Sequence, residues 1–262
     1  MRPNKLRAKL EAGEPTVSTH IHSTWPSVVE ALGHTGIYDY VEFVAEYGSF
    51  DLHDLDNICR AAELHSMEVM IKVDQSHQAF LAQRGIGAGF TGVLFTDVRS
   101  AEDVRQCVRI ARPDTPEDGG LYGVATRRNS YAIGDGTPEY VEELRQTVVA
   151  IMIEKKGAVD NLEEVLSVPG IDMIQWGGSD YSMSIGRPAE HDHPDVANAR
   201  KRVFTTAIEM GVPPRVEIES VDEAKEYLDM GVRHFSIGTD ITILHSWWKS
   251  NGEKLWRAIS GD

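Results

Sequence analysis

Eight short apolar runs, separated by amphipathic helical stretches, predict a closed (β/α)8 barrel for this chain of 262 residues. Such a barrel takes about 250 residues, so the length fits one. The content of 41% hydrophobic and 26% charged residues is that of an ordinary globular protein. We therefore expect one α/β domain over residues 1–262, a TIM barrel, with a doubly wound open sheet as the alternative.

The expected strands are short and rich in branched apolar residues. They are residues 16–22, 38–44, 68–73, 92–95, 148–153, 173–176, 215–218 and 234–237. After the seventh strand, Ser220 and Glu223 have the spacing of a capping box, and Gly231 is placed to end the helix. After the fifth strand, an apolar stripe at helical spacing ends at Pro169 and Gly170. These signals predict a helix between successive strands.

One segment interrupts this repeat. Residues 112–137 are rich in Pro, Gly and Asp and far exceed an ordinary connection of about 4–6 residues. Long loops on a rigid scaffold are often functional. We expect this excursion to shape the site, with Arg127 as a candidate for substrate binding; a solvated surface excursion is the alternative.

The charge balance excludes some partners. The chain has 26 basic and 41 acidic residues, a net charge of −15, which argues against nucleic acid and anionic membranes. Cys59 and Cys107 fall in expected helices, so we expect two buried thiols and a reducing, cytoplasmic setting. No apolar run approaches the about 20 residues of a membrane span, and residues 1–13 are too charged for a signal peptide.

Two acidic residues follow successive strands and indicate a metal site. Glu154 follows the fifth strand and Asp180 the sixth. In a parallel barrel the carboxyl ends of the strands form the active site, and carboxylates there suit a hard divalent cation. Lys155 and Lys156 come directly after Glu154 and could neutralise it instead. Metal-assisted chemistry on a small oxygen-rich molecule is the first hypothesis.

Other strand ends carry further candidates for catalysis. His20 and His22 lie two apart on the first strand and so share one side of it. Tyr47 follows the second strand, and Lys72 lies near the end of the third. All four groups are expected at the same rim as the two carboxylates.

Several linked motifs resemble those of one enzyme family. They are Leu10-Glu-Ala-Gly-Glu-Pro15, Ile151-Met-Ile-Glu154, Asp160-Asn-Leu-Glu-Glu164 with Val168-Pro-Gly170, Gly177-Gly-Ser-Asp-Tyr-Ser182 and Ile237-Gly-Thr-Asp240. In this order and spacing, over nearly the whole chain, the sequence is similar to the HpcH/HpaI class II aldolases, which are metal-dependent pyruvate aldolases. Each motif alone is weak, and their linked order is what makes the resemblance specific.

The resemblance implies a barrel of the phosphoenolpyruvate/pyruvate-domain type. It implies that Glu154 and Asp180 hold Mg²⁺ or Mn²⁺, with Co²⁺ as a third option. It further implies that backbone amides near Ser179 receive the carboxylate of a 2-oxo acid, with Gly178 in the same turn. Trp176, just before this turn, either lines the substrate site or packs within the barrel.

The resemblance also implies a homo-oligomer, a hexamer built as a trimer of dimers in which neighbouring subunits complete the sites. The segment 244–259 carries Trp247, Trp248 and Trp256 and is compatible with an interface. It could equally pack as the last helix on its own barrel.

Three departures from the family pattern involve four positions. Where the family has an Asp and His pair after the second strand, this chain has Val44 and Tyr47. Lys72 stands in place of an arginine, and His20 in place of a tryptophan. Tyrosine is a poor base at neutral pH, since its pKa is near 10. We therefore expect the proton-transfer group to be relocated, with His20, His22 or Tyr47 moving the proton and Lys72 stabilising an oxyanion.

The leading function is that of an aldehyde-lyase that cleaves a 4-hydroxy-2-oxo acid, or a related oxo acid, into pyruvate or a similar enolate and an aldehyde. A first alternative keeps the same site but forms the enolate by decarboxylating a β-oxo acid of the oxaloacetate type. A Schiff-base aldolase using Lys72 and a non-catalytic barrel that binds a small acid are further alternatives.

Overall fold

Eight parallel strands form a closed barrel in the computed structural model, which describes residues 3–125, 127–128, 131 and 136–261. The strands are β1 (Thr16–Ile21), β2 (Tyr40–Val44), β3 (Glu68–Val73), β4 (Gly92–Phe95), β5 (Val148–Ile153), β6 (Met173–Trp176), β7 (Pro214–Ile218) and β8 (His234–Thr239). Each strand pairs with the next in the sequence, and β8 pairs with β1. The predicted barrel is thus confirmed, and the open sheet is wrong.

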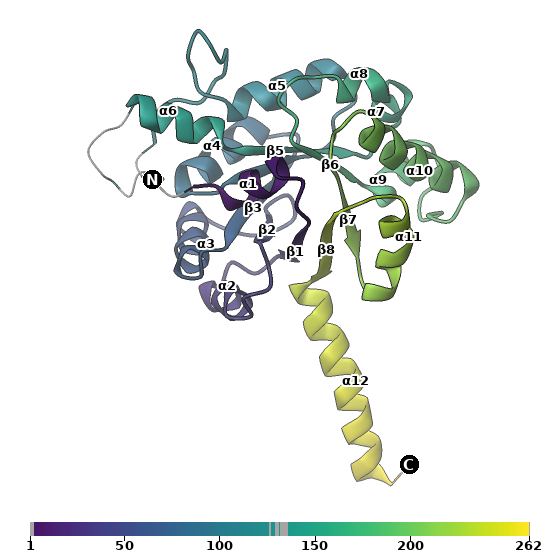
Figure 1. Ribbon diagram of the computed structural model, residues 1–262. Coiled ribbons are helices and arrows are strands. Elements are labelled where there is room, and N and C mark those ends of the chain that lie inside the picture. The colour runs from purple at the N-terminus through teal and green to yellow at the C-terminus, as the bar shows by residue number, and fades with distance from the viewer. Residues whose placement is uncertain (1–2, 126, 129–130, 132–135, 262) are drawn as a thin grey trace.

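All the described helices except α12 lie around the strands (Figure 1). The helices are α1 (Lys5–Glu11), α2 (Pro26–Gly33), α3 (Leu52–Leu64), α4 (Gln78–Ala88), α5 (Ala101–Ala111), α6 (Pro138–Arg145), α7 (Lys156–Asp160), α8 (Leu162–Leu166), α9 (Gly178–Ser184), α10 (Pro194–Glu209), α11 (Ala224–Asp229) and α12 (Asp240–Ser260), with a 3-10 turn η1 (Val221–Glu223). The predicted capping box of Ser220 and Glu223 is present, and Gly231 follows α11 with φ +95°.

The barrel interior divides along its axis into an apolar and a polar part. Leu6 of α1 packs among inward-facing residues of β2 to β6, including Tyr40 and Met70, and so closes the amino end of the barrel. Residues of the opposite parity along the same strands face the helices and form the larger apolar core. Toward the carboxyl end the interior becomes polar, with His20, Glu42 and Arg215 buried there.

The excursion after α5 lies at the amino end of the barrel. It leads from α5 to α6 and then into β5, and segments that run from a helix to the next strand lie opposite the carboxyl ends of the strands. Pro113 bridges to Tyr122, which is buried. The expectation that the excursion shapes the site is therefore wrong for its described part; residues 126, 129–130 and 132–135 lie outside the described residues.

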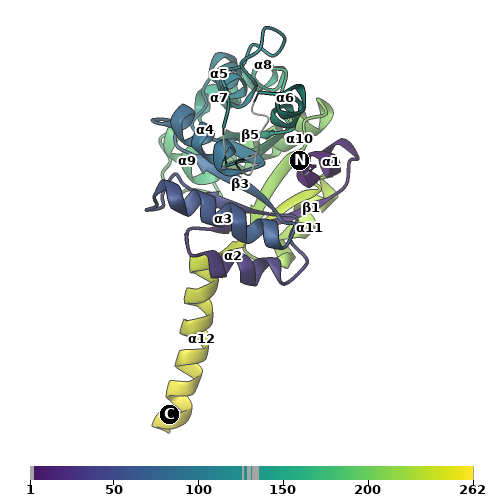
Figure 2. The same ribbon diagram turned by 90° about the vertical axis from the view of Figure 1, so that its left-hand side faces the viewer.

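Helix α12 stands clear of the barrel, as two views at right angles agree (Figures 1 and 2). Every described residue from Ile241 onward is exposed, and Trp247, Trp248 and Trp256 are 62–67% exposed. The helix therefore does not cover the outer side of β8, where Phe235 is only partly buried. The alternative that this segment packs on its own barrel is wrong.

Two smaller expectations concern the cysteines and membrane-spanning segments. Cys59 and Cys107 are both free and buried, as predicted. Among the described residues, the helices lack the length and apolar content needed to cross a bilayer.

Candidate active site

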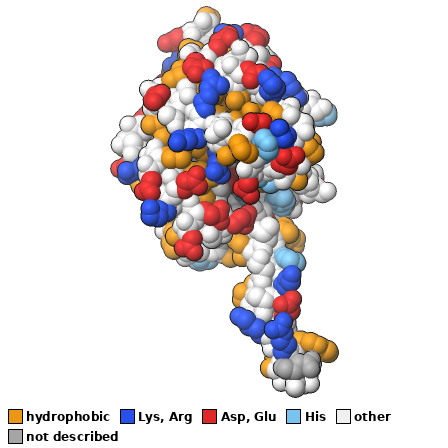
Figure 3. All heavy atoms as spheres, turned by 90° about the vertical axis from the view of Figure 1, so that its right-hand side faces the viewer, with side chains coloured by type: hydrophobic (Ala, Val, Ile, Leu, Met, Phe, Trp, Pro, Cys, Tyr) orange, Lys and Arg blue, Asp and Glu red, His pale blue; other side chains and the backbone are white. Residues whose placement is uncertain are grey.

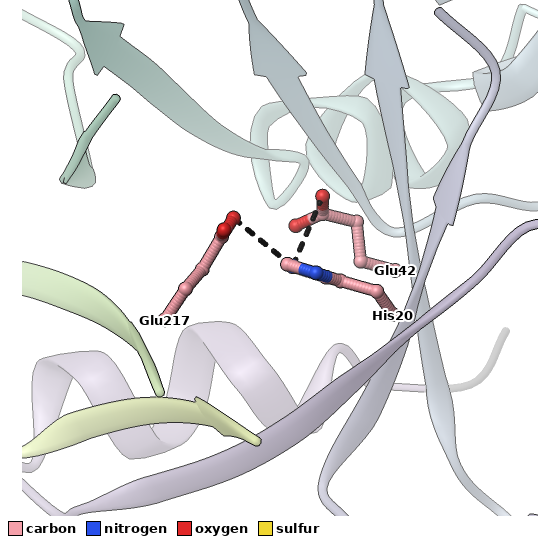
Figure 4. A group of neighbouring side chains, drawn as sticks. All are labelled: His20, Glu42 and Glu217. Carbon is pink, nitrogen blue, oxygen red and sulfur yellow. Dashed lines mark ion pairs between the residues drawn. The ribbon is translucent and has the colours of Figure 1, made fainter. Parts of the chain in front are cut away.

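Ionisable side chains from separate strands meet inside the carboxyl end of the barrel. His20 of β1, Glu42 of β2 and Glu217 of β7 occupy inward-facing positions and point toward one another (Figure 4). This end of a TIM barrel is where active sites lie. The three strands come from opposite ends of the sequence, and barrel closure brings them together.

One nitrogen of His20 lies close to both hydrogen-bond acceptors and a hydrogen-bond donor. Its Nε2 lies 3.4 Å from Glu42 Oε1 and 3.2 Å from Glu217 Oε1, and Arg215 Nη2 lies 2.9 Å from the same Nε2. A guanidinium only donates and a carboxylate accepts, so Nε2 has a partner with or without its proton. Burial lowers the pKa of His20, but Glu42 and Glu217 outweigh burial and raise it above the usual value. The geometry suits a group that carries a proton and releases it.

Arg215 connects the side chains of this cluster through hydrogen bonds. It is fully buried and donates to Glu42 and to Gln175, and Gln175 in turn donates to Glu217. Burial raises the pKa of Glu42, but Arg215 and His20 outweigh it and hold that carboxyl well below its usual range. His20, Glu42 and Glu217 are close enough together to bind a cation. In the structure Arg215 pairs with Oε2 of Glu42 and so partly neutralises this group.

Lys72 and Tyr47 form a second group beside this network. Lys72 Nζ lies 2.8 Å from Glu46 Oε2 and 3.5 Å from the Tyr47 hydroxyl. Burial lowers the pKa of Lys72, but Glu46 and Glu42 outweigh burial and raise it, so the amine is an ammonium. Desolvation of its phenol raises the pKa of Tyr47 to about 12, which makes it a hydrogen-bond donor and not a base at neutral pH. His22 lies at the rim, its ring centroid 6.4 Å from that of Tyr47.

The two carboxylates of the expected metal site lie at adjacent strand ends. Glu154 is buried, and its Oε1 accepts a hydrogen bond from the Asp97 amide at 2.7 Å. Asp180, in the first turn of α9, is more exposed. Lys155 does not neutralise Glu154 directly: its Nζ lies 2.6 Å from Asp180 Oδ1 and 2.8 Å from Asp97 Oδ1. Lys156 turns away and pairs with Asp160.

Local backbone geometry makes room for these groups. A Cβ added at Gly177 would lie 2.5 Å from Glu154 Oε2, so the turn after β6 requires glycine beside this carboxylate. Asp97 has φ +62°, a left-handed conformation that costs a non-glycine residue about 1–3 kcal/mol. In this conformation the Asp97 amide donates to Glu154 and the Asp97 carboxylate contacts Lys155.

The raised pKa of Glu154 predicts how the affinity for a divalent cation changes with pH. Burial raises its pKa from 4.5 to about 7, so the neutral acid stabilises the metal-free fold at low pH, and that contribution is lost as pH rises through about 7. A metal ligand must be deprotonated. We therefore expect Mn²⁺ affinity measured by calorimetry to fall by about tenfold per pH unit below pH 7. An affinity that stays constant between pH 8 and pH 6 would contradict this expectation.

The other predicted substrate residues divide into two groups. Gly178 and Ser179 begin α9 and line a cavity of about 480 Å³ that also borders Glu217. Trp176 lines the same cavity but faces the helix layer, where its ring lies 4.8 Å from that of Tyr181. Trp176 thus borders the cavity and also packs against the helix layer, and its part in substrate binding stays a prediction.

Arg127 is not part of this site. Its guanidinium lies 2.8 Å from Glu63, near the end of α3. Helices of the barrel run back from the carboxyl to the amino ends of the strands, so this position is at the opposite end of the molecule. The prediction that Arg127 binds substrate in its own barrel is a misassignment, made because the excursion was placed at the wrong end.

The sequence interpretation missed Glu42, Arg215 and Gln175. Each is an inward-facing polar residue within an otherwise apolar strand and is fully buried. The available signal was a charge in mid-strand, as in Tyr40-Val-Glu-Phe-Val44, since an isolated buried charge requires a partner. Their partners could not be assigned without the barrel register.

The fold and the cluster define an enzyme of the (β/α)8 class, with acids, an ammonium and a histidine at the carboxyl mouth. The HpcH/HpaI aldolase/citrate lyase family model matches residues 19–246, so the chain belongs to that family.

Curated relatives and a solved structure agree with this assignment. The chain is 26% identical to the 5-keto-4-deoxy-D-glucarate aldolase of Klebsiella pneumoniae over 93% of both chains. It is 27% identical to the hydroxypyruvate/pyruvate aldolase of Paraburkholderia phytofirmans, covering 91% of this chain and 92% of that one. A family protein from Burkholderia cenocepacia superposes with a TM-score of 0.87 at 25% identity, covering 96% of this chain and 99% of that one. The resemblance to an aldolase family is confirmed.

Proposed function

We propose that the protein is a divalent-metal-dependent aldolase that cleaves a 4-hydroxy-2-oxo acid into pyruvate, or a similar 2-oxo acid, and an aldehyde. The observation that carries the proposal is the pair Glu154 and Asp180 at adjacent strand ends, with Lys72 and His20 inside the same mouth. The aldolase relatives support the reaction class.

The residues present fit a divalent cation. The Lys155 ammonium pairs with Asp180 and Asp97, and the Asp97 amide donates to Glu154, so the group carries excess negative charge once Glu154 is ionised. Glu154 and Asp180 would hold the ion, and substrate oxygens and water would complete the six oxygen ligands that Mg²⁺ or Mn²⁺ prefers. When bound, the cation supplies Lewis-acid stabilisation of negative charge on the oxo acid.

The chain's own residues account for the remaining steps. The amides of Ser179 and Asp180, in the first turn of α9, are suited to receive the substrate carboxylate. A proton leaves the 4-hydroxyl group, the C3–C4 bond breaks, the aldehyde carbonyl forms and the electron pair becomes an enolate. Lys72 is the ammonium placed to stabilise the oxyanion, and His20 takes the hydroxyl proton and returns one to C3.

One observation favours decarboxylation as a second candidate. The carboxylates Glu42 and Glu217 raise the pKa of His20, which suits a proton donor better than a base. Loss of CO₂ from a β-oxo acid needs no base and ends with protonation of the same enolate carbon. Both reactions use the same site and differ in the substrate and in whether a base must first take a hydroxyl proton.

Parallel assays would separate these candidates. Purified protein is incubated with Mn²⁺ and either oxaloacetate or a 4-hydroxy-2-oxo acid, and pyruvate is measured by a coupled assay. We expect cleavage of the hydroxy acid, lost with EDTA and with Glu154→Gln. Release of CO₂ from oxaloacetate alone would establish the decarboxylase, and binding of pyruvate without any turnover would identify a non-catalytic barrel.

A Schiff base on Lys72 is testable with the same protein. Because Glu46 and Glu42 keep this amine charged, it is a poor nucleophile. Borohydride trapping with pyruvate is expected to leave Lys72 unmodified. A covalent adduct that persists in EDTA would replace the metal mechanism.

We also propose a homo-oligomer in which α12 packs on another copy. Figure 3 shows apolar side chains along the projecting α12, whose tryptophans are exposed, and Phe235 of β8 is only partly buried, so both surfaces are available to another copy. Trp247→Asp combined with Trp256→Asp is expected to reduce the mass measured by light scattering. Trp25→Asp, at an equally exposed tryptophan of the barrel, is the matched control and should leave the mass unchanged.

A further inference from the structure

Lys155 lies where a cation would be expected to bind. Its side chain is only 14% exposed, and its ammonium contacts both Asp180 and Asp97. Asp180 is one of the two carboxylates offered above as metal ligands, and Asp97 orients the other, Glu154, through its amide. The ammonium therefore pairs with two carboxylates, one of them a proposed metal ligand and the other a neighbour of the second ligand.

A divalent cation and this ammonium cannot share the site without cost. Two like charges within about 4 Å repel each other by several kcal/mol at the effective dielectric of a protein surface. Asp180 Oδ1 also accepts its short hydrogen bond from Lys155, so the same oxygen would have to exchange an N–H donor for a metal ion. Binding of the ion requires Lys155 to leave Asp180.

The surroundings give Lys155 somewhere to go. An open cavity of about 430 Å³ is lined by Lys155 itself with Arg99, Met183 and Ser184, and borders Asp180. Lys155 has extended backbone angles just before α7, and its side chain is a flexible four-carbon stem. Rotation of the side chain would move the ammonium into solvent without changing the backbone.

We propose that Lys155 is a tethered competitor of the metal: it neutralises Asp180 and Asp97 in the metal-free protein and must be displaced when the cation binds. This inference rests on the proposed metal site at Glu154 and Asp180. The consequence is a protein that is stable without metal but binds it more weakly than the carboxylates alone would allow.

Calorimetric titration of metal-free protein with Mn²⁺ tests the inference without any activity assay. Lys155→Met, which keeps the length of the side chain and removes the charge, is expected to bind Mn²⁺ at least about tenfold more tightly than the wild type. Lys155→Arg keeps the charge and should stay near the wild-type affinity. Lys156→Met is the matched control, because Lys156 pairs with Asp160 and should not change the affinity.

The wild-type protein offers a second measurement. An amine-reactive ester is applied with and without Mn²⁺, and labelling of Lys155 and Lys156 is resolved by fragment mass spectrometry. We expect Mn²⁺ to increase labelling of Lys155 several-fold and to leave Lys156 unchanged. This measurement holds even if a Lys155 variant fails to fold.

The possible outcomes distinguish failure of the competitor role from failure of the proposed metal site. If the wild type binds Mn²⁺, Glu154→Gln abolishes binding, and Lys155→Met binds no more tightly, the competitor role is wrong and the metal site stands. Protection of Lys155 from labelling by Mn²⁺ also overturns the role. If the wild type does not bind Mn²⁺ at all, both the metal site and the inference fail.

Discussion

Replacing His20 by asparagine is expected to lower kcat by about 10²- to 10⁴-fold, the usual contribution of a positioned acid or base. The imidazole is the titratable group of the network that has both an acceptor pair, Glu42 and Glu217, and a donor, Arg215, around one nitrogen. Asparagine keeps hydrogen bonding but cannot move a proton. Mn²⁺ affinity should stay unchanged, since His20 does not contact Glu154 or Asp180.

Two further histidines make this result interpretable. His234 is also buried inside the barrel, but it lies near the amino end and hydrogen-bonds Thr16. His234→Asn should therefore reduce stability without a comparable loss of kcat. If His22→Asn costs more activity than His20→Asn, proton transfer belongs to the rim beside Tyr47 and the role given to His20 is wrong.

Among the substitutions proposed for this protein, removal of the Glu42 carboxylate is expected to lower the free energy of unfolding most. Glu42→Leu leaves the fully buried Arg215 without its carboxylate partner, and breaking a buried pair costs about 3–5 kcal/mol. Urea unfolding followed by circular dichroism measures this free energy. The double variant Glu42→Leu with Arg215→Met should recover most of the loss, because no unpaired charge remains.

A surface pair provides the comparison for this experiment. Lys225 and Asp229 form an exposed pair on α11, and Lys225→Ala should leave the unfolding midpoint unchanged. If Glu42→Leu is no less stable than the surface variant, Arg215 is compensated from another source. If the double variant is as unstable as the sum of its parts, the cost comes from packing and not from charge.

The strands were predictable because their signal is local. Runs such as Val148–Ile153 are apolar throughout, as expected for strands buried on both faces, and their ends need no knowledge of neighbours. The positions of Glu154 and Asp180 were predictable for the same reason, since both residues follow strands whose ends lie at one rim, and their role as metal ligands stays a prediction. The helix after β7 followed from its capping box.

The network around His20 was not predictable, because it depends on register between distant strands. His20 could be assigned to a rim, but its contacts with Glu217 and Arg215 join residues about 200 positions apart. The misassigned Arg127 has a related cause: composition marked the excursion as unusual but carried no information on which end of the barrel it occupies. The helical periodicity of α12 likewise could not tell whether this helix packs on its own barrel or projects from it.

The Arg215 contacts have a consequence for the order of folding. Arg215 meets Glu42 and His20 across 173 and 195 residues of chain, and both contacts exist only when β7 and β8 have closed against β1. Contacts of such long sequence separation form late, after the entropy of closing the loop has been lost. A nascent or partly folded chain therefore holds an uncompensated guanidinium in its unfinished interior. We expect His20 to acquire its partners in the last step of folding, so that a half-built barrel lacks this network.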